Sequence, residues 1–94
     1  MIKIALVVNL AKDPTKNREA LAMLDYLKPR HPKVTFVRTL TESNALVELT
    51  CRQELPVRDA AAEVKRGLKI NSCRIWHEQT IRSGDGRFLH KHGR

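Results

Sequence analysis

Residues 2–10, with the sequence IKIALVVNL, decide which fold the rest of the chain can adopt. The stretch is almost unbroken aliphatic, rich in β-branched side chains, and too short to form a buried helix. A run of this kind is typical of a strand that is buried on both faces in the middle of a sheet. We therefore expect a sheet built around residues 2–10.

A helix is predicted directly after this strand. Asp13 suits the N-cap position, and Pro14 suits the first helical turn, where its missing N–H is not needed. Apolar residues at spacings of three and four then continue to about Lys28. Pro29 and Pro32 are expected to end the helix.

The rest of the chain repeats this pattern. Further elements are predicted from apolar spacing and β-branched content: strands over 33–40, 45–51 and 73–81, and a helix from near Pro56 to about Lys69. A shift of forty residues aligns Ala5-Leu6-Val7 with Ala45-Leu46-Val47, which indicates either two related βαβ units or the composition that any two such units share. Asp85-Gly86 is a hairpin-turn pair and predicts a short last strand over 87–92.

The predicted order of elements favours an α+β fold, the ferredoxin-like βαββαβ sandwich, in which an antiparallel sheet carries two helices on one face. The first and third strands would be central, and the second and fourth would form the edges. We expect residues 1–82 to make this single domain and residues 83–94 to add a short, basic C-terminal β-hairpin. Because many unrelated functions use this architecture, it indicates no function by itself.

The two cysteines, Cys51 and Cys73, are predicted to be free thiols. They are too few for a disulfide scaffold, and the expected strand order places their strands two spacings of ~4.8 Å apart, beyond disulfide reach. The first residues do not resemble a signal peptide, and no stretch approaches the ~20 apolar residues that span a bilayer. We therefore expect a cytoplasmic protein with no membrane association and no cofactor.

The charge balance favours a polyanionic partner. The chain has 18 Lys and Arg residues against 10 Asp and Glu residues, which gives a formal net charge of +8. A basic excess of this size attracts nucleic acid, although a solvated charged surface explains it equally well. The candidate phosphate contacts gather toward the C-terminus: Lys65, Arg66, Lys69, Arg74, Arg82, Arg87, Lys91 and Arg94.

The sheet face left open by the helices is a second candidate surface. Residues 2–10 are apolar on both sides, whereas a half-exposed antiparallel strand should alternate. We expect a homodimer that buries this face, with Leu6 or Val7, Val37 and Trp76 at the interface. The C-terminal hairpin or a different protein could cover the face instead. RNA reading of the RRM type is not expected, because the two central strands lack the aromatic residues on which that domain stacks bases.

No catalytic pattern is supported by residue spacing, and the protein is more simply interpreted as a non-enzyme. A zinc site of His77, His90 and His92 would depend on an assumed hairpin register, so no metal site is predicted. The leading hypothesis is a small, basic protein that binds nucleic acid, RNA foremost, through Lys and Arg contacts to phosphates. The alternative is a protein-interaction module, such as a mobile-element-encoded inhibitor or accessory factor, that docks through the aliphatic sheet face. A small nuclease is the third hypothesis.

Overall fold

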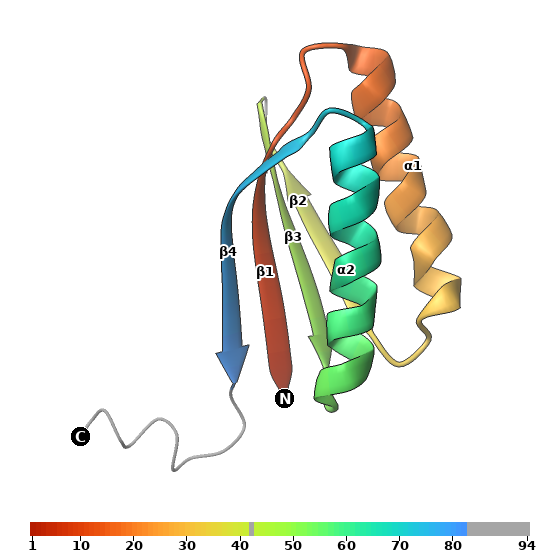
Figure 1. The fold of residues 1–94 in the computed structure, drawn as a ribbon, viewed down its shortest axis with the longest axis vertical. Helices are drawn as coiled ribbons and strands as arrows, with labels where there is room; N and C mark the ends of the chain where they lie inside the picture. Colours follow the sequence, from red (N-terminus) through yellow and green to blue (C-terminus); the bar gives the residue numbers. More distant parts are fainter. Residues whose placement is uncertain (42, 83–94) are drawn as a thin grey trace, which may run out of the picture.

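The computed structural model describes residues 1–41 and 43–82. Its elements follow the chain in the order β1 (Ile2–Asn9), α1 (Pro14–Arg30), β2 (Thr35–Leu40), β3 (Asn44–Cys51), α2 (Glu54–Ile70) and β4 (Arg74–Arg82). The strands form one antiparallel sheet in the order β2-β3-β1-β4, and both helices lie against one face of it (Figure 1). The predicted α+β class is confirmed, and the arrangement is compatible with a ferredoxin-like sandwich. The expected C-terminal hairpin lies outside the described residues.

The core lies between the sheet and the helices and is built outward from β1. This strand is hydrogen-bonded to β3 on one side and to β4 on the other. Ile4, Leu6 and Val8 are at most 4% exposed and point toward the helices. Ala5 and Val7 alternate with them and lie half-buried on the opposite face. The strand is therefore apolar on both faces, as its sequence indicates, but only one face is covered by the helices.

Both helices extend beyond their predicted bounds. α1 continues through Pro29, because a proline so close to the C-terminus removes one donor only, and the N–H of His31 closes the end by donating to the carbonyl of Lys28 at 3.2 Å. α2 begins at Glu54, two residues before Pro56. The first four N–H groups of a helix have no intrahelical acceptor, so Pro56 loses no hydrogen bond there. The two prolines were wrong guides to the helix ends for this reason.

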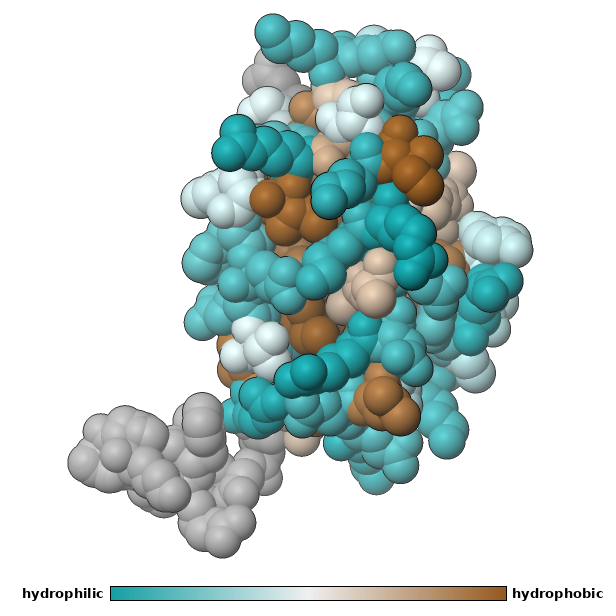
Figure 2. Space-filling view, in the orientation of Figure 1, coloured by the Kyte–Doolittle hydropathy of each residue, from teal (hydrophilic) through white to brown (hydrophobic). Residues whose placement is uncertain are grey.

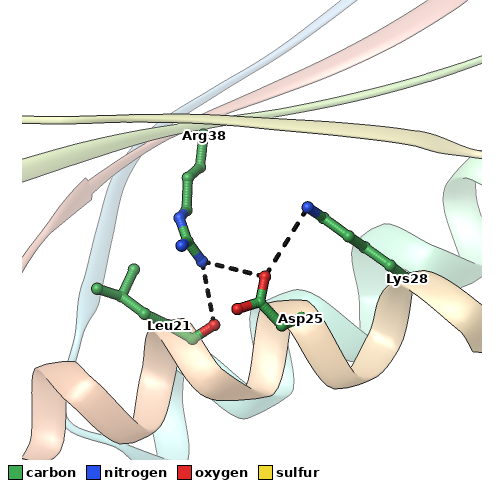
Figure 3. A network of polar contacts seen from close by, with 4 residues as sticks. All are labelled: Leu21, Asp25, Lys28 and Arg38. Atoms are coloured by element: carbon green, nitrogen blue, oxygen red, sulfur yellow. Dashed lines mark hydrogen bonds and ion pairs between the residues drawn. The ribbon is translucent and has the colours of Figure 1, made fainter.

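Arg38 directs its charged side chain from the edge strand β2 toward α1. Arg38 donates hydrogen bonds from Nη1 to the carbonyl of Leu21 at 3.2 Å and to Oδ1 of Asp25 at 3.4 Å (Figure 3). Nζ of Lys28 lies 3.8 Å from the same carboxylate oxygen. A charged side chain directed inward from an edge strand hinders pairing with a foreign strand. The network also fixes β2 to α1.

Candidate nucleic-acid interface

Most acidic side chains in the described part of the chain already contact a basic one. The ion pairs join Lys3 to Glu48, Lys28 and Arg38 to Asp25, Arg30 to Glu63, Arg58 and Arg82 to Glu54, and Lys65 to Glu78. His31 also contacts the carboxylate of Glu63. These cations serve in part to balance acidic groups of the domain itself. The candidates for an external anion are therefore the cations that remain unpaired.

Eight Lys and Arg side chains have no carboxylate partner within residues 1–41 and 43–82: Lys12, Lys16, Arg18, Lys33, Arg52, Arg66, Lys69 and Arg74. Six of them lie at one end of the sandwich, where β1 leads into α1 and α2 leads into β4 (top of Figure 1). We call this set the basic end: Lys12, Lys16, Arg18, Arg66, Lys69 and Arg74. Hydrophilic side chains cover this end in the space-filling view (Figure 2). Lys33 and Arg52 lie at the opposite end, where they line a common pocket with Met1.

Asn17 links the two segments that form the basic end. Its Oδ1 accepts a hydrogen bond from the N–H of Ala11 at 2.6 Å, and its Nδ2 donates to the carbonyl of the same residue. The Sγ of Cys73 lies 3.8 Å from the same Oδ1. Ala11 belongs to the connection between β1 and α1, and Cys73 directly precedes β4. The amide of Asn17 therefore joins the start of α1 to Ala11 and lies in contact with Cys73, directly before β4.

A tight turn carries the chain from α2 into β4. Ser72 has a φ of 63°, in the left-handed region, and its N–H donates to the carbonyl of Lys69 at 3.1 Å. The N–H of Cys73 donates to the carbonyl of Leu68 at 2.9 Å. These two bonds form a Schellman motif, which ends a helix by reversing the chain. The reversal brings Arg74 back toward the last turns of α2.

This turn creates a groove that contains four of the predicted phosphate-binding residues. The groove is open, has a volume of about 680 Å³, and is lined by Lys65, Arg66, Lys69, Ser72, Cys73, Arg74 and Ile75. Nζ of Lys65 lies 3.0 Å from Oε1 of Glu78, so this lysine is partly neutralised. The other three cations of the groove belong to the unpaired set. The structure thus brings together Lys65, Arg66, Lys69 and Arg74.

Arg82, the next predicted phosphate contact along the chain, does not line this groove. Arg82 is the last residue of β4, eight residues after Arg74, which corresponds to about 26 Å along a strand. Its Nη2 donates a hydrogen bond to Oε2 of Glu54 at 2.8 Å, and this bond lowers the pKa of that carboxyl below its usual value. The other predicted contacts, Arg87, Lys91 and Arg94, lie outside the described residues.

Lys12, Lys16 and Arg18 were not recognised as site residues from the sequence. One signal could have identified two of them. The first turn of α1 holds no acidic residue, although acids are favoured there by the helix dipole, and Lys16 and Arg18 follow instead. The expected topology supplies the other signal, because it places the start of the first helix at the same end as the finish of the second.

The predicted interface residues occupy different environments. Leu6 is 0% exposed and faces the helices, so it cannot lie on the open face, and its inclusion in the interface is wrong. The alternative, Val7, does lie there, paired across the sheet with Leu46 of β3. Val37 is 48% exposed and Trp76 is 56% exposed. The homodimer itself stays a prediction.

The predicted free thiols are confirmed, since Cys51 and Cys73 are both unpaired and buried. No helix in the described ranges is long and apolar enough to cross a bilayer. In comparisons with known proteins, the chain matches no protein-family model and no curated protein. Function therefore has to be inferred from the residues of this chain.

Proposed function

We propose that this protein binds nucleic acid at its basic end and contacts backbone phosphates through Lys and Arg side chains. The observation that supports this most directly is the distribution of unpaired charge: six of the eight unpaired cations of the described residues gather at one end. A surface whose charges serve only solubility has no need to gather its unpaired cations. Concentrated cations attract polyanions and supply most of the affinity for a phosphate backbone.

The electrostatics of α1 add to this attraction. Lys16 and Arg18 lie in the first turns of the helix, where the macrodipole is positive and the N-cap Asp13 is the acidic group that offsets it. Charges of equal sign at this position are unfavourable in the free protein. A phosphate bound nearby would relieve them. In this proposal the protein acts in the cytoplasm as a non-enzymatic binder with little preference among base sequences.

The proposal also covers residues 83–94 and the open face of the sheet. Arg87, Lys91 and Arg94, which lie outside the described residues, are proposed as further phosphate contacts. The chain also forms a homodimer through its open sheet face, around Val7 and Val37. If the open face takes a different protein instead, the chain is an interaction module. The exposure of Val37, 48%, favours a partner on this face but does not identify it.

A matched pair of double variants tests the proposed function. K69Q/R74Q removes one Lys and one Arg from the basic end, and K33Q/R52Q removes the same residue types from the opposite end. Fluorescence anisotropy measures the affinity for a labelled oligouridylate and for a labelled DNA duplex over a range of salt concentrations. K69Q/R74Q should lower the slope of log affinity against log salt by about 1.4 to 1.8, which is ~0.7 to 0.9 per lost contact.

The control variant K33Q/R52Q should leave the slope near that of the wild type. Equal slopes for both variants would show that the unpaired cations act only through net charge, which contradicts a defined site. No binding to either nucleic acid at low salt would instead favour the interaction module. Neutralising Arg87, Lys91 and Arg94 together shows in the same titration whether residues 83–94 add contacts.

A further inference from the structure

Trp76 is the one tryptophan of the chain, and its position is unusual for this residue type. It lies on the edge strand β4, two residues after Arg74, and is 56% exposed. Tryptophan side chains in soluble domains bury most of their surface, because water contact with the large ring is unfavourable. An indole this exposed, one residue after Ile75 in the lining of the basic groove, is a candidate contact for a ligand.

A β-bulge sets the position of this side chain. Val7 of β1 pairs with His77, whereas the next residue, Val8, pairs with Ile75. Trp76 is therefore the extra residue of β4 and has no partner in β1. Bulges of this kind re-aim a side chain and bend the strand, and β4 curves near its start (Figure 1). The indole ring lies beside the exposed imidazole of His77, with 6.1 Å between ring centroids and 46° between ring planes.

We propose that Trp76 is a stacking platform for an unpaired base, so that the nucleic acid bound at the basic end is single-stranded. This inference rests on the proposed function and adds the class of nucleic acid. Two residues along a strand span about 6.6 Å, so a phosphate on Arg74 and a base on Trp76 can belong to the same short stretch of one strand. A base inside a duplex is stacked on both faces and cannot lie on a side chain, whereas an unpaired base can.

This arrangement differs from that of an RRM, whose aromatic residues lie on the two central strands. Here the central strands β1 and β3 lack aromatic side chains, and the platform is at the edge, next to the cations of α2 and β4. Stacking on one indole tolerates any base, so it adds affinity for single strands without sequence specificity. The expected contribution corresponds to an affinity change between about 5-fold and 150-fold.

Because Trp76 is the single tryptophan, its fluorescence reports directly on this contact. We expect an unlabelled oligouridylate to quench the emission of the full-length protein, and a blunt DNA duplex to bind with little quenching. W76A should weaken binding of the oligouridylate by about 5-fold or more while leaving the duplex affinity and the salt slope unchanged. W76F should retain most of the single-strand affinity, because it keeps an aromatic face.

The outcomes separate this inference from the proposed function. If both nucleic acids bind with a strong salt dependence, but W76A binds the oligouridylate as tightly as the wild type, the stacking platform is refuted and the basic end is retained. If neither nucleic acid binds, the proposed function fails first. If W76A changes the sedimentation coefficient from dimer to monomer and leaves oligouridylate affinity unchanged, Trp76 is an interface residue and the platform is also refuted.

Discussion

Substitution of Asn17 tests how the basic end is built. Its side-chain amide satisfies both the N–H and the carbonyl of Ala11 at a half-buried position. Asn17→Ala removes both bonds, and each is worth a net ~0.5 to 1.5 kcal/mol, so we expect the free energy of unfolding to fall by about 1–3 kcal/mol. In a domain of this size that loss lowers Tm by about 5–20 °C. Urea unfolding followed by circular dichroism measures the change.

Asn17→Asp separates the two hydrogen bonds. At neutral pH the carboxylate still accepts from the N–H of Ala11, but it cannot donate to the carbonyl, and the two oxygens repel each other. The positive end of the α1 macrodipole and the neighbouring Lys16 and Arg18 favour a carboxylate at this position and offset part of that loss.

The control for these variants is Asn9→Ala. Asn9 is exposed at the end of β1, and its side chain makes no hydrogen bond to another described residue. We expect this substitution to change the free energy of unfolding by no more than about 0.5 kcal/mol. The reasoning is refuted if Asn17→Ala is as mild as the control.

Two further predictions concern the turn before β4 and the open face. Ser72→Gly should raise the urea midpoint. The left-handed conformation costs serine ~1–2 kcal/mol and costs glycine nothing, and this gain exceeds the ~0.5–1 kcal/mol that glycine loses in backbone entropy on folding. A lower midpoint would contradict the strain at this position. Val7→Asp should turn the expected homodimer into a monomer or an insoluble protein, whereas Ala22→Asp, on the exposed side of α1, should not. A wild-type protein that sediments as a monomer at high concentration would argue against the dimer.

The sheet and helices could be predicted because their signals are local. The unbroken aliphatic run of β1 indicates a strand buried among neighbours, and the alternation in β3 correctly separates Val47 and Leu49 from Glu48 and Thr50. The helix ends were less predictable. The tolerance of a proline depends on how close it lies to a helix end: Pro56 is in the first turn, where no hydrogen bond is lost, and Pro29 is near the C-terminus, where one is lost.

The site was predicted only in part, because its composition depends on pairing between distant residues. Lys65 meets Glu78, and Arg82 meets Glu54, across sequence separations of 13 and 28 residues. From the sequence alone these cations were indistinguishable from the unpaired ones. The contribution of Lys12, Lys16 and Arg18 was missed because they join the C-terminal cations through the topology, not through sequence.

Most of the formal positive charge belongs to residues 1–82. Residues 83–94 hold Arg87, Lys91 and Arg94 against Asp85, so they supply +2 of the formal net charge of +8, and residues 1–82 supply +6. The fold, through its turns and its Asn17 contact, therefore positions most of the unpaired charge.

The basic end and the open sheet face can function independently, with one exception. The groove lies beside α2, on the helix side of the sheet, whereas Val7 lies on the opposite side. A dimer formed around Val7 would leave Lys69 and Arg74 accessible. Trp76 is the residue that both proposals assign, and an indole buried between subunits cannot also stack on a base. Its fluorescence during oligouridylate titration of the wild type and of Val7→Asp therefore decides between them: quenching in both proteins assigns Trp76 to nucleic acid, quenching only in the monomeric Val7→Asp shows that the dimer covers it, and quenching in neither refutes the stacking platform.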